Sequence, residues 1–205
     1  GAAQGVGAAT ARAFAKRGAN LVLIARGQEK LDALADELDL GDRVMVAPLD
    51  VTDIAGFGKL LARADEVFGS VDVLVNNAGI HSRGRVENVS ADDIGRMIDV
   101  NLKAPLMATR LTLPYLRRSK HPAVINVASL AGRTPVPGSA TYSATKFGMR
   151  AFGLALAEEL RGSNIKIASV SPGPIDTGFI MDDIDTVTDL TFSQPISTAE
   201  QVADA

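Results

Sequence analysis

The chain has 205 residues, 46% hydrophobic and 22% charged, which fits a single soluble domain spanning residues 1–205 with a sizeable core. Its net charge of −3 argues against nucleic acid or an anionic membrane as the main partner. The lack of cysteine excludes disulfides and thiolate metal sites, and the two histidines show no metal-binding spacing, so no metal is expected. No apolar run approaches the roughly 20 residues of a spanning helix and no signal peptide precedes Gly1, so a cytoplasmic location is expected by default.

Short apolar runs alternate with longer segments of helical period. The predicted strands are Leu21–Ala25, Val44–Pro48, Val71–Val75, Val124–Ala128 and Ile165–Val170. The predicted helices are Gly7–Arg17, Gln28–Leu38, Ile54–Phe68, Ala91–Arg118 and Ser139–Arg161. This alternation predicts an α/β fold, a doubly wound parallel sheet with helices on both faces.

A glycine-rich turn, Gly1-Ala2-Ala3-Gln4-Gly5-Val6-Gly7, opens the sequence directly before the first predicted helix. A turn of this kind is expected to follow a strand, and a central strand cannot be omitted without loss of ladder hydrogen bonds and burial. The last residues, Gln201–Ala205, fall inside an apparent helix. We therefore expect the sequence to be incomplete at both ends, with the first strand missing.

The same turn is a candidate phosphate-binding site. Its glycines allow close backbone approach, and the helix that follows directs free N–H groups and its positive dipole end at a ligand such as a pyrophosphate. Alone, this motif fits an ordinary turn equally well. The next strand ends at Ala25-Arg26, where a ribose-reading side chain belongs. A guanidinium there attracts a 2′-phosphate, so NADP(H) is favoured over NAD(H), unless Arg26 is only a solvated surface charge.

Tyr142 and Lys146 stand four residues apart in a predicted helix and so share one face. A free tyrosine titrates near 10, but a cation about 4 Å away at an effective dielectric near 20 contributes roughly 4 kcal/mol. That is about three pKa units, so the lysine is expected to bring the phenol near pH 7, where acid–base catalysis is efficient. Ser129 follows a strand, on the rim where ligands bind in parallel sheets, and its hydroxyl can hold a substrate oxygen.

Six motifs occur in this order along the chain: Gly1-x-x-x-Gly5-x-Gly7, Asn76-Asn77-Ala78-Gly79, Asn101, Ser129, Tyr142-x-x-x-Lys146 and Pro172-Gly173. On these motifs the chain resembles the short-chain dehydrogenase/reductase family, in its common single-domain branch. The resemblance implies a Rossmann-type fold and a hydride-transferring NAD(P)(H) enzyme. It implies that Tyr142 is the general acid/base, Ser129 positions the substrate oxygen, Lys146 lowers the tyrosine pKa and holds the nicotinamide ribose, and Asn101 keeps a water in the proton relay.

Further cofactor contacts are implied by the resemblance. Asp50-Val51 would contact the adenine, the loop Asn76–Gly79 would line the cofactor, and Pro172–Thr177 would lie over the nicotinamide; read alone, the latter two are also ordinary turn sequences. The full predicted set is Gly1, Gln4, Gly5, Val6, Gly7, Arg26, Asp50, Val51, Asn77, Ala78, Gly79, Tyr142, Lys146, Pro172, Gly173, Ile175 and Thr177. The terminal strand usual in the family is also missing, which leaves assembly open.

Pro105 gives Asn101 independent support, because it follows four residues later and has no N–H to donate. In a shared helix, the Asn101 carbonyl loses its usual partner, and we predict that it faces Lys146 and holds a water. A Pro-kinked helix without catalytic meaning is the alternative.

A homodimer or homotetramer is expected. Gly148 and Gly153 lie within one predicted helix at a cost of roughly 1 kcal/mol each, which favours close approach by another backbone. The helix Ala91–Arg118 is apolar around much of its circumference, more than one buried stripe needs. The family resemblance implies the same two-helix contact; burial under the chain's own sheet and loops is the alternative.

The substrate is expected to be a small apolar molecule with a carbonyl or secondary alcohol, covered by a flap at about residues 176–196. This leads to an alcohol dehydrogenase or ketoreductase. An NAD-dependent dehydrogenase and a non-catalytic dinucleotide-binding sensor remain alternatives, although a sensor is expected to have lost Tyr142 or Lys146. An epimerase or dehydratase of the extended branch fits poorly, because its glycine spacing and substrate region differ.

Overall fold

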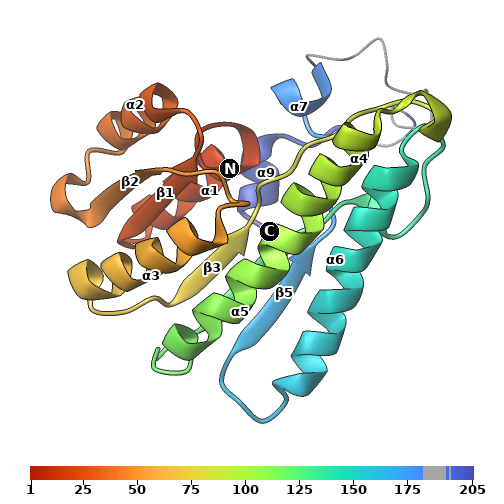
Figure 1. The fold of residues 1–205 in the computed structure, drawn as a ribbon. Helices are drawn as coiled ribbons and strands as arrows, with labels where there is room; N and C mark the ends of the chain where they lie inside the picture. The colour runs from red at the N-terminus through yellow and green to blue at the C-terminus, as the bar shows by residue number, and fades with distance from the viewer. Residues whose placement is uncertain (182–192, 194) are drawn as a thin grey trace.

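The protein was studied as a computed structural model that describes residues 1–181, 193 and 195–205. The strands are β1 (Leu21–Ala25), β2 (Val44–Pro48), β3 (Val73–Asn76), β4 (Ala123–Val127) and β5 (Lys166–Val170). The α-helices are α1 (Gly5–Lys16), α2 (Gln28–Leu38), α3 (Ile54–Phe68), α4 (Ala91–Ile98), α5 (Ala104–Leu116), α6 (Ala140–Glu159), α7 (Gly178–Met181) and α9 (Ala199–Ala203). Helices α3, α5 and α6 lie in front of the strands, and α1 and α9 pack together behind them (Figure 1).

All described strand pairs are parallel, which confirms the predicted α/β fold of Rossmann type. The predicted bounds of β1, β2, α2 and α3 are those observed, whereas the other elements begin or end one or two residues away from their predicted limits. The difference falls mainly at ends next to glycine, proline or polar residues, where hydrogen-bond pairing rather than hydrophobicity decides the limit.

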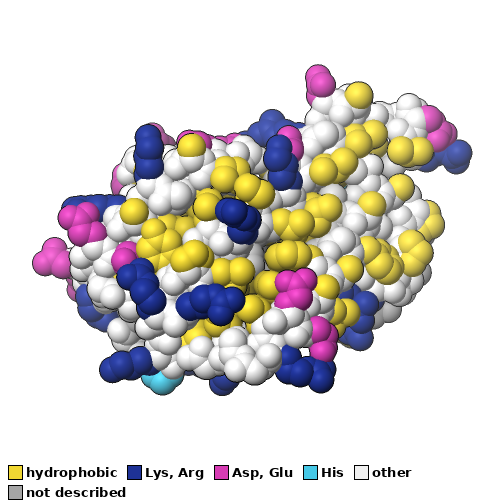
Figure 2. Space-filling model, turned by 60° about the horizontal axis from the view of Figure 1, so that its bottom comes forward, with side chains coloured by type: hydrophobic (Ala, Val, Ile, Leu, Met, Phe, Trp, Pro, Cys, Tyr) yellow, Lys and Arg dark blue, Asp and Glu magenta, His cyan; other side chains and the backbone are white. Residues whose placement is uncertain are grey.

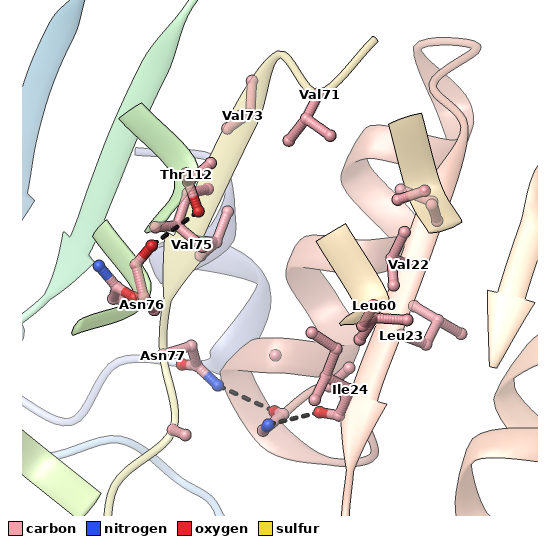
Figure 3. Close-up of a pocket in the computed structure, with 18 of the residues that line it drawn as sticks. Val22, Leu23, Ile24, Leu60, Val71, Val73, Val75, Asn76, Asn77 and Thr112 are labelled. Carbon is pink, nitrogen blue, oxygen red and sulfur yellow. Dashed lines mark hydrogen bonds between the residues drawn. The ribbon is translucent and has the colours of Figure 1, made fainter. Parts of the chain in front are cut away.

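The described strands form two sheets, in the orders β1-β2 and β3-β4-β5. An apolar groove of about 370 Å³ separates the facing edges of β1 and β3, and Val22, Ile24, Val73 and Val75 line it (Figure 3). Two hydrogen bonds link the β3 side of the groove to the β1 side through Gly1. Asn77 Nδ2 donates to the Gly1 carbonyl at 2.9 Å, and Gly1 N donates to the Ile24 carbonyl (Figure 3).

The face at the bottom of Figure 1 comes forward in Figure 2, where hydrophobic side chains gather across its middle between charged ones. This is the end of the molecule where the parallel strands begin. The opposite end, where they finish, carries the candidate site. None of the helices in the described part of the chain is long and apolar enough to cross a membrane.

The predicted helix Ala91–Arg118 is not regular. A π-helical turn, Asp99–Lys103, separates α4 from α5, and the Ala104 N–H donates to the carbonyl of Asp99, five residues back. Pro105 explains the change in pitch, because it has no N–H to continue the α-helical ladder to Asn101. The π turn also brings Asn101 inward, and this side chain is 1% exposed.

The two glycines of α6 correct one expectation. A Cβ on Gly148 would lie 3.0 Å from the Leu102 side chain, and a Cβ on Gly153 would lie 2.8 Å from Ser169 Oγ. Both glycines therefore make room for side chains of the same chain. The prediction that they mark close approach by another backbone was wrong, because spacing in a helix does not reveal which neighbour fills the space.

Candidate active site

One cavity of about 630 Å³ lies at the carboxyl ends of the strands. Its walls come from the glycine turn before α1, the loop after β3, the end of β4, the first turns of α6 and the segment after β5. Parallel sheets place ligands at this edge, because the loops that follow the strands converge there. The cavity thus joins segments that are far apart in the sequence.

Most of the predicted site residues share this cavity. Those that line it are Gly1, Gln4, Gly5, Val6, Asn77, Ala78, Gly79, Ser129, Tyr142, Lys146, Pro172, Gly173, Ile175 and Thr177. Five others do not: Gly7 and Val51 line the groove between β1 and β3, Asn101 is buried, and Arg26 and Asp50 lie outside the cavity. Part of the expected flap, residues 182–192 and 194, lies outside the described residues.

Tyr142 and Lys146 lie one turn apart on the inner face of α6, and both are buried. Lys146 Nζ donates to the Val127 carbonyl at 2.9 Å and lies 5.6 Å from the centroid of the Tyr142 ring. Ser129 follows β4, its Oγ accepts the Ala131 N–H at 3.1 Å, and its hydroxyl acts to lower the pKa of Tyr142. The phenol, the hydroxyl and the ammonium therefore converge on one wall of the cavity.

The pKa of Tyr142 differs from the expectation. Burial raises the pKa of Tyr142 to about 12, although the Ser129 hydrogen bond and Arg83 act in the opposite direction. Burial also lowers the pKa of Lys146 to about 8. The predicted Tyr142 pKa near 7 was wrong for the protein alone, because desolvation of the phenolate exceeds the attraction of nearby cations.

The Asn101 side chain hydrogen-bonds to the backbone of the loop after β3. Its Oδ1 accepts the Ile80 N–H at 2.8 Å, its Nδ2 donates to the Ile80 carbonyl at 2.8 Å, and Nδ2 also contacts Thr145 Oγ1 at 3.4 Å. A Cβ on Gly79 would lie 3.5 Å from Asn101 Oδ1 and 3.7 Å from Lys146 Nζ. Asn101 Oδ1 and Lys146 Nζ therefore both lie close to Gly79, which lines the cavity while Asn101 does not.

The glycine turn has the features that a dinucleotide needs. Helix α1 begins at Gly5 without a side-chain cap and without an acidic residue in its first turn, so its free N–H groups and positive end are available to an anion. Gly7 is required for packing rather than for the ligand, since a Cβ there would lie 1.9 Å from the Gly1 carbonyl oxygen. Gln4, Gly5 and Val6 present this end to the cavity. The residues present fit a pyrophosphate.

Arg26 lies just after β1 and is exposed, beside the glycine turn. Two hydrogen bonds within the loop hold Asp50: its Oδ1 accepts the Thr52 N–H at 3.0 Å and the Thr52 hydroxyl at 2.8 Å. The backbone hydrogen bond is the main reason why the pKa of Asp50 is lowered, and Arg26 contributes to the same direction. Sequence reasoning missed Lys30, whose Nζ donates to Gln4 Oε1 at 3.0 Å and adds a second cation at this edge.

Sequence reasoning also missed two side chains near Tyr142, His81 and Arg83. Both line the cavity together with Phe179, which belongs to the expected flap. The imidazole of His81 stacks on the Tyr142 ring at 4.2 Å between centroids, and Phe179 lies 6.1 Å from the same ring. Arg83 Nη2 donates to the Phe179 carbonyl at 3.0 Å. A single histidine in a loop carries no sequence signal for this arrangement.

A parallel α/β protein with an uncapped glycine-turn helix and a buried tyrosine–lysine pair in one cavity has the architecture of a nicotinamide-dependent oxidoreductase. A sequence profile described as short chain dehydrogenase matches residues 1–187, and the chain belongs to this family. The family resemblance is thus confirmed, and with it an oxidoreductase of a family that binds NAD(P)(H).

The relatives carry general names. The chain is 38% identical to an uncharacterized oxidoreductase of Staphylococcus saprophyticus over 179 residues, which cover 86% of this chain and 72% of the relative. It is 34% identical to one of Staphylococcus epidermidis over 177 residues, covering 86% and 76% of the two chains. The corresponding identity to an uncharacterized oxidoreductase of Staphylococcus aureus is 35% over 177 residues, with the same coverage.

Proposed function

We propose that the protein interconverts a carbonyl compound and a secondary alcohol, with NADP(H) as cofactor and Tyr142 as the acid/base. The observation that carries this proposal is the meeting of Tyr142, Ser129 and Lys146 in the cavity that the positive end of α1 also faces. The cofactor, when bound, supplies or accepts the hydride. The protein's own residues hold the substrate oxygen, exchange its proton and keep water away from the reacting carbon.

In the reducing direction, Ser129 donates a hydrogen bond to the carbonyl oxygen, and the Tyr142 hydroxyl gives that oxygen a proton. The high pKa of Tyr142, about 12, keeps the hydroxyl protonated at neutral pH, which suits it to act as the acid. Lys146 provides a positive charge behind the phenol that stabilises the phenolate as it forms. Asn101 supports this set through its hydrogen bonds to Ile80, and we keep the proposal that its backbone carbonyl holds a water of the proton relay.

The cofactor contacts divide along the cavity. The glycine turn and the N-terminus of α1 would hold the pyrophosphate, and the segment Pro172–Thr177 would cover the nicotinamide. Asp50 and Val51, which do not line this cavity, would contact the adenine beyond its edge. Arg26 together with Lys30 favours a 2′-phosphate, because two cations attract a dianion at this edge. Tighter binding of NADH than NADPH would replace this assignment with an NAD-dependent dehydrogenase.

The substrate end of the cavity supports an apolar carbonyl compound. Leu130, Val136, Pro137 and Pro174 line this region, and Phe179 adds a half-exposed aromatic ring. We propose that residues 176–196 act as a flap of one catalytic domain. The chain is further proposed to assemble as a homodimer or homotetramer, and exposed Ile98, Phe147 and Leu154 on α4 and α6 support this.

The test is NADPH oxidation against a panel of apolar ketones, with Tyr142→Phe as the variant. The phenylalanine keeps the ring and its packing but lacks the proton, so kcat is expected to fall by about 10²–10⁴-fold. Thr141→Ala, one residue earlier on α6, serves as the matched control and should retain activity. Equal turnover by the wild type and Tyr142→Phe would reject the mechanism. Binding of cofactor without turnover on any substrate would instead favour the non-catalytic sensor.

A further inference from the structure

The Tyr142 ring packs against the imidazole ring of His81. The His81 imidazole lies 4.2 Å from it between centroids, with an angle of 21° between the planes, so the two rings are stacked face to face. Phe179 completes a cluster of three rings at 6.3 Å from His81 and 6.1 Å from Tyr142. The imidazole therefore covers one face of the phenol on the cavity side.

The backbone on both sides of His81 is fixed. The preceding residue, Ile80, makes two hydrogen bonds of 2.8 Å to the Asn101 side chain. The following residue, Ser82, donates its N–H to Met97 Sδ at 3.4 Å, and Met97 itself is fully buried against Tyr142. A loop held at two consecutive anchor points leaves His81 little freedom to move away from the phenol. The stack is thus built into the fold.

We propose that His81 is a positioning residue for Tyr142, its imidazole face holding the phenol ring so that the hydroxyl stays directed at Ser129 and the cavity. This inference rests on the proposed function, because it assigns His81 a role in the Tyr142 acid/base step. The sequence motifs on which the family resemblance rests do not include this residue. The chemical requirement is a flat, uncharged ring at position 81.

The state of the imidazole agrees with that requirement. Burial lowers the pKa of His81 to about 4, and the charges of Arg83 and Lys146 act in the same direction. Among the described residues, the titratable groups that act on the imidazole are these two cations, and the Tyr142 phenol stacks on it, so the ring is neutral at physiological pH. Its Nε2 is buried and has no hydrogen-bond partner within the described residues. What the ring offers to Tyr142 is its face, not a proton.

A direct measurement needs no catalysis. The chain has two tyrosines and no tryptophan, so Tyr115→Phe leaves Tyr142 as the only source of tyrosinate absorbance. In that background His81→Ala opens one face of the phenol to water, and the Tyr142 pKa is expected to fall from about 12 toward its ordinary value of 10. His81→Phe restores a flat ring and should keep the pKa high. Ser82→Ala, which retains the backbone contact to Met97, is the matched control.

Kinetics give the second readout. His81→Ala should lower kcat by about tenfold, the scale of one aromatic contact, with a smaller change in KM. His81→Phe should recover kcat to within about threefold of the wild type, whereas His81→Asn, polar but not a flat ring of this size, should not. Recovery by His81→Asn but not by His81→Phe would overturn the proposal, as would an unchanged Tyr142 titration in His81→Ala. A wild type without hydride transfer would reject the proposed function, while the titration would still decide the stack.

Discussion

Lys146 lies beside the face of Tyr142 rather than free in the cavity: its Nζ is 5.6 Å from the centroid of the phenol ring and donates to the Val127 carbonyl. Both side chains are almost fully enclosed, with 4% of Lys146 and 8% of Tyr142 exposed. Enclosure disfavours the charged form of each group, which is why the pKa of the lysine is lowered and that of the tyrosine is raised. A charge on either buried group therefore lowers the stability of the folded state, and other contacts must offset this loss.

The first prediction concerns this cost. Folded Lys146 loses its proton near pH 8, whereas the unfolded lysine keeps it to about 10.5, so between these values the unfolded state binds more protons and stability rises with pH. Lys146→Met has no such group. From pH 7 to pH 10 the free energy of unfolding of the wild type should gain up to about 3 kcal/mol relative to this variant.

Urea unfolding at the two pH values measures this difference. The upper limit of pH 10 matters, because above it Tyr142, with its raised pKa, begins to lower stability as the unfolded phenol ionises first. The variant Lys166→Met removes an exposed lysine in β5 and controls for the loss of one positive charge. Parallel pH profiles for the wild type and Lys146→Met would show that Lys146 stays charged in the folded protein.

The second prediction concerns the 2′-phosphate. Arg26→Ala removes the guanidinium next to the glycine turn, and a charge-assisted hydrogen bond of about 1.5–3 kcal/mol is lost with it. The dissociation constant for NADPH should rise between about tenfold and a hundredfold, while that for NADH stays unchanged. Lys30→Ala should show a smaller effect of the same kind, since its Nζ is already paired with Gln4.

Calorimetric titration with the two cofactors gives both constants. Arg43→Ala, which removes an exposed arginine just before β2 and so at the other end of the strands, is the control. An equal loss of affinity for NADH and NADPH in Arg26→Ala would mean that Arg26 contacts a part shared by both cofactors. The preference for NADP(H) would then have no support from this residue.

The residues that sequence could predict are those whose signal is local. The runs Leu21–Ala25 and Gln28–Leu38 carry their own period and end at glycine or polar residues, and both were predicted to the residue. Tyr142, Lys146 and Ser129 were found through motif spacing, and the structure brings them into one cavity. The spacing of the glycines also predicted the glycine turn. Only the structure shows why residue 7 must be glycine, because a Cβ there would overlap the Gly1 carbonyl oxygen.

What sequence could not predict depends on burial. The Tyr142 pKa was predicted from one pair of charges, whereas in the folded protein burial of the phenol dominates and raises its pKa. His81 gave no signal, because its partners Tyr142 and Phe179 lie 61 and 98 residues further along the chain. The π turn at Asp99–Lys103 was not predicted. The sequence indicated only that Pro105 leaves the Asn101 carbonyl without its usual partner, and no pattern distinguishes a kink from a change in pitch.

The third prediction concerns Asn101. Asn101→Ala leaves the Ile80 N–H and carbonyl without their partners, and a buried unpaired group costs about 1–3 kcal/mol. The free energy of unfolding should therefore fall by about 2–4 kcal/mol. Asn101→Asp keeps the acceptor for the N–H but places a carboxylate against the Ile80 carbonyl, so it should be destabilising as well.

Chemical denaturation checks this prediction, with Asn88→Ala, an exposed asparagine in the same region of the chain, as the control. Unchanged stability of Asn101→Ala would show that water replaces both hydrogen bonds to Ile80. In that case the anchor on the loop that carries His81 is weaker than the contacts indicate.

The last prediction concerns assembly. Phe147 and Leu154 are seven residues apart on α6, so they share one face of the helix, and both side chains are exposed, Leu154 by 56%. Ile98 adds a third exposed apolar side chain at the end of α4, which packs beside α6. Burial of these side chains against a second copy would remove about 25 cal/mol of unfavourable hydration per Å² of apolar surface.

Leu154→Glu should therefore shift the protein to a smaller species in sedimentation velocity, whereas Val67→Glu, an exposed apolar position on α3, should not. An unaltered sedimentation coefficient in Leu154→Glu would place the subunit contact, if the wild type has one, on another face.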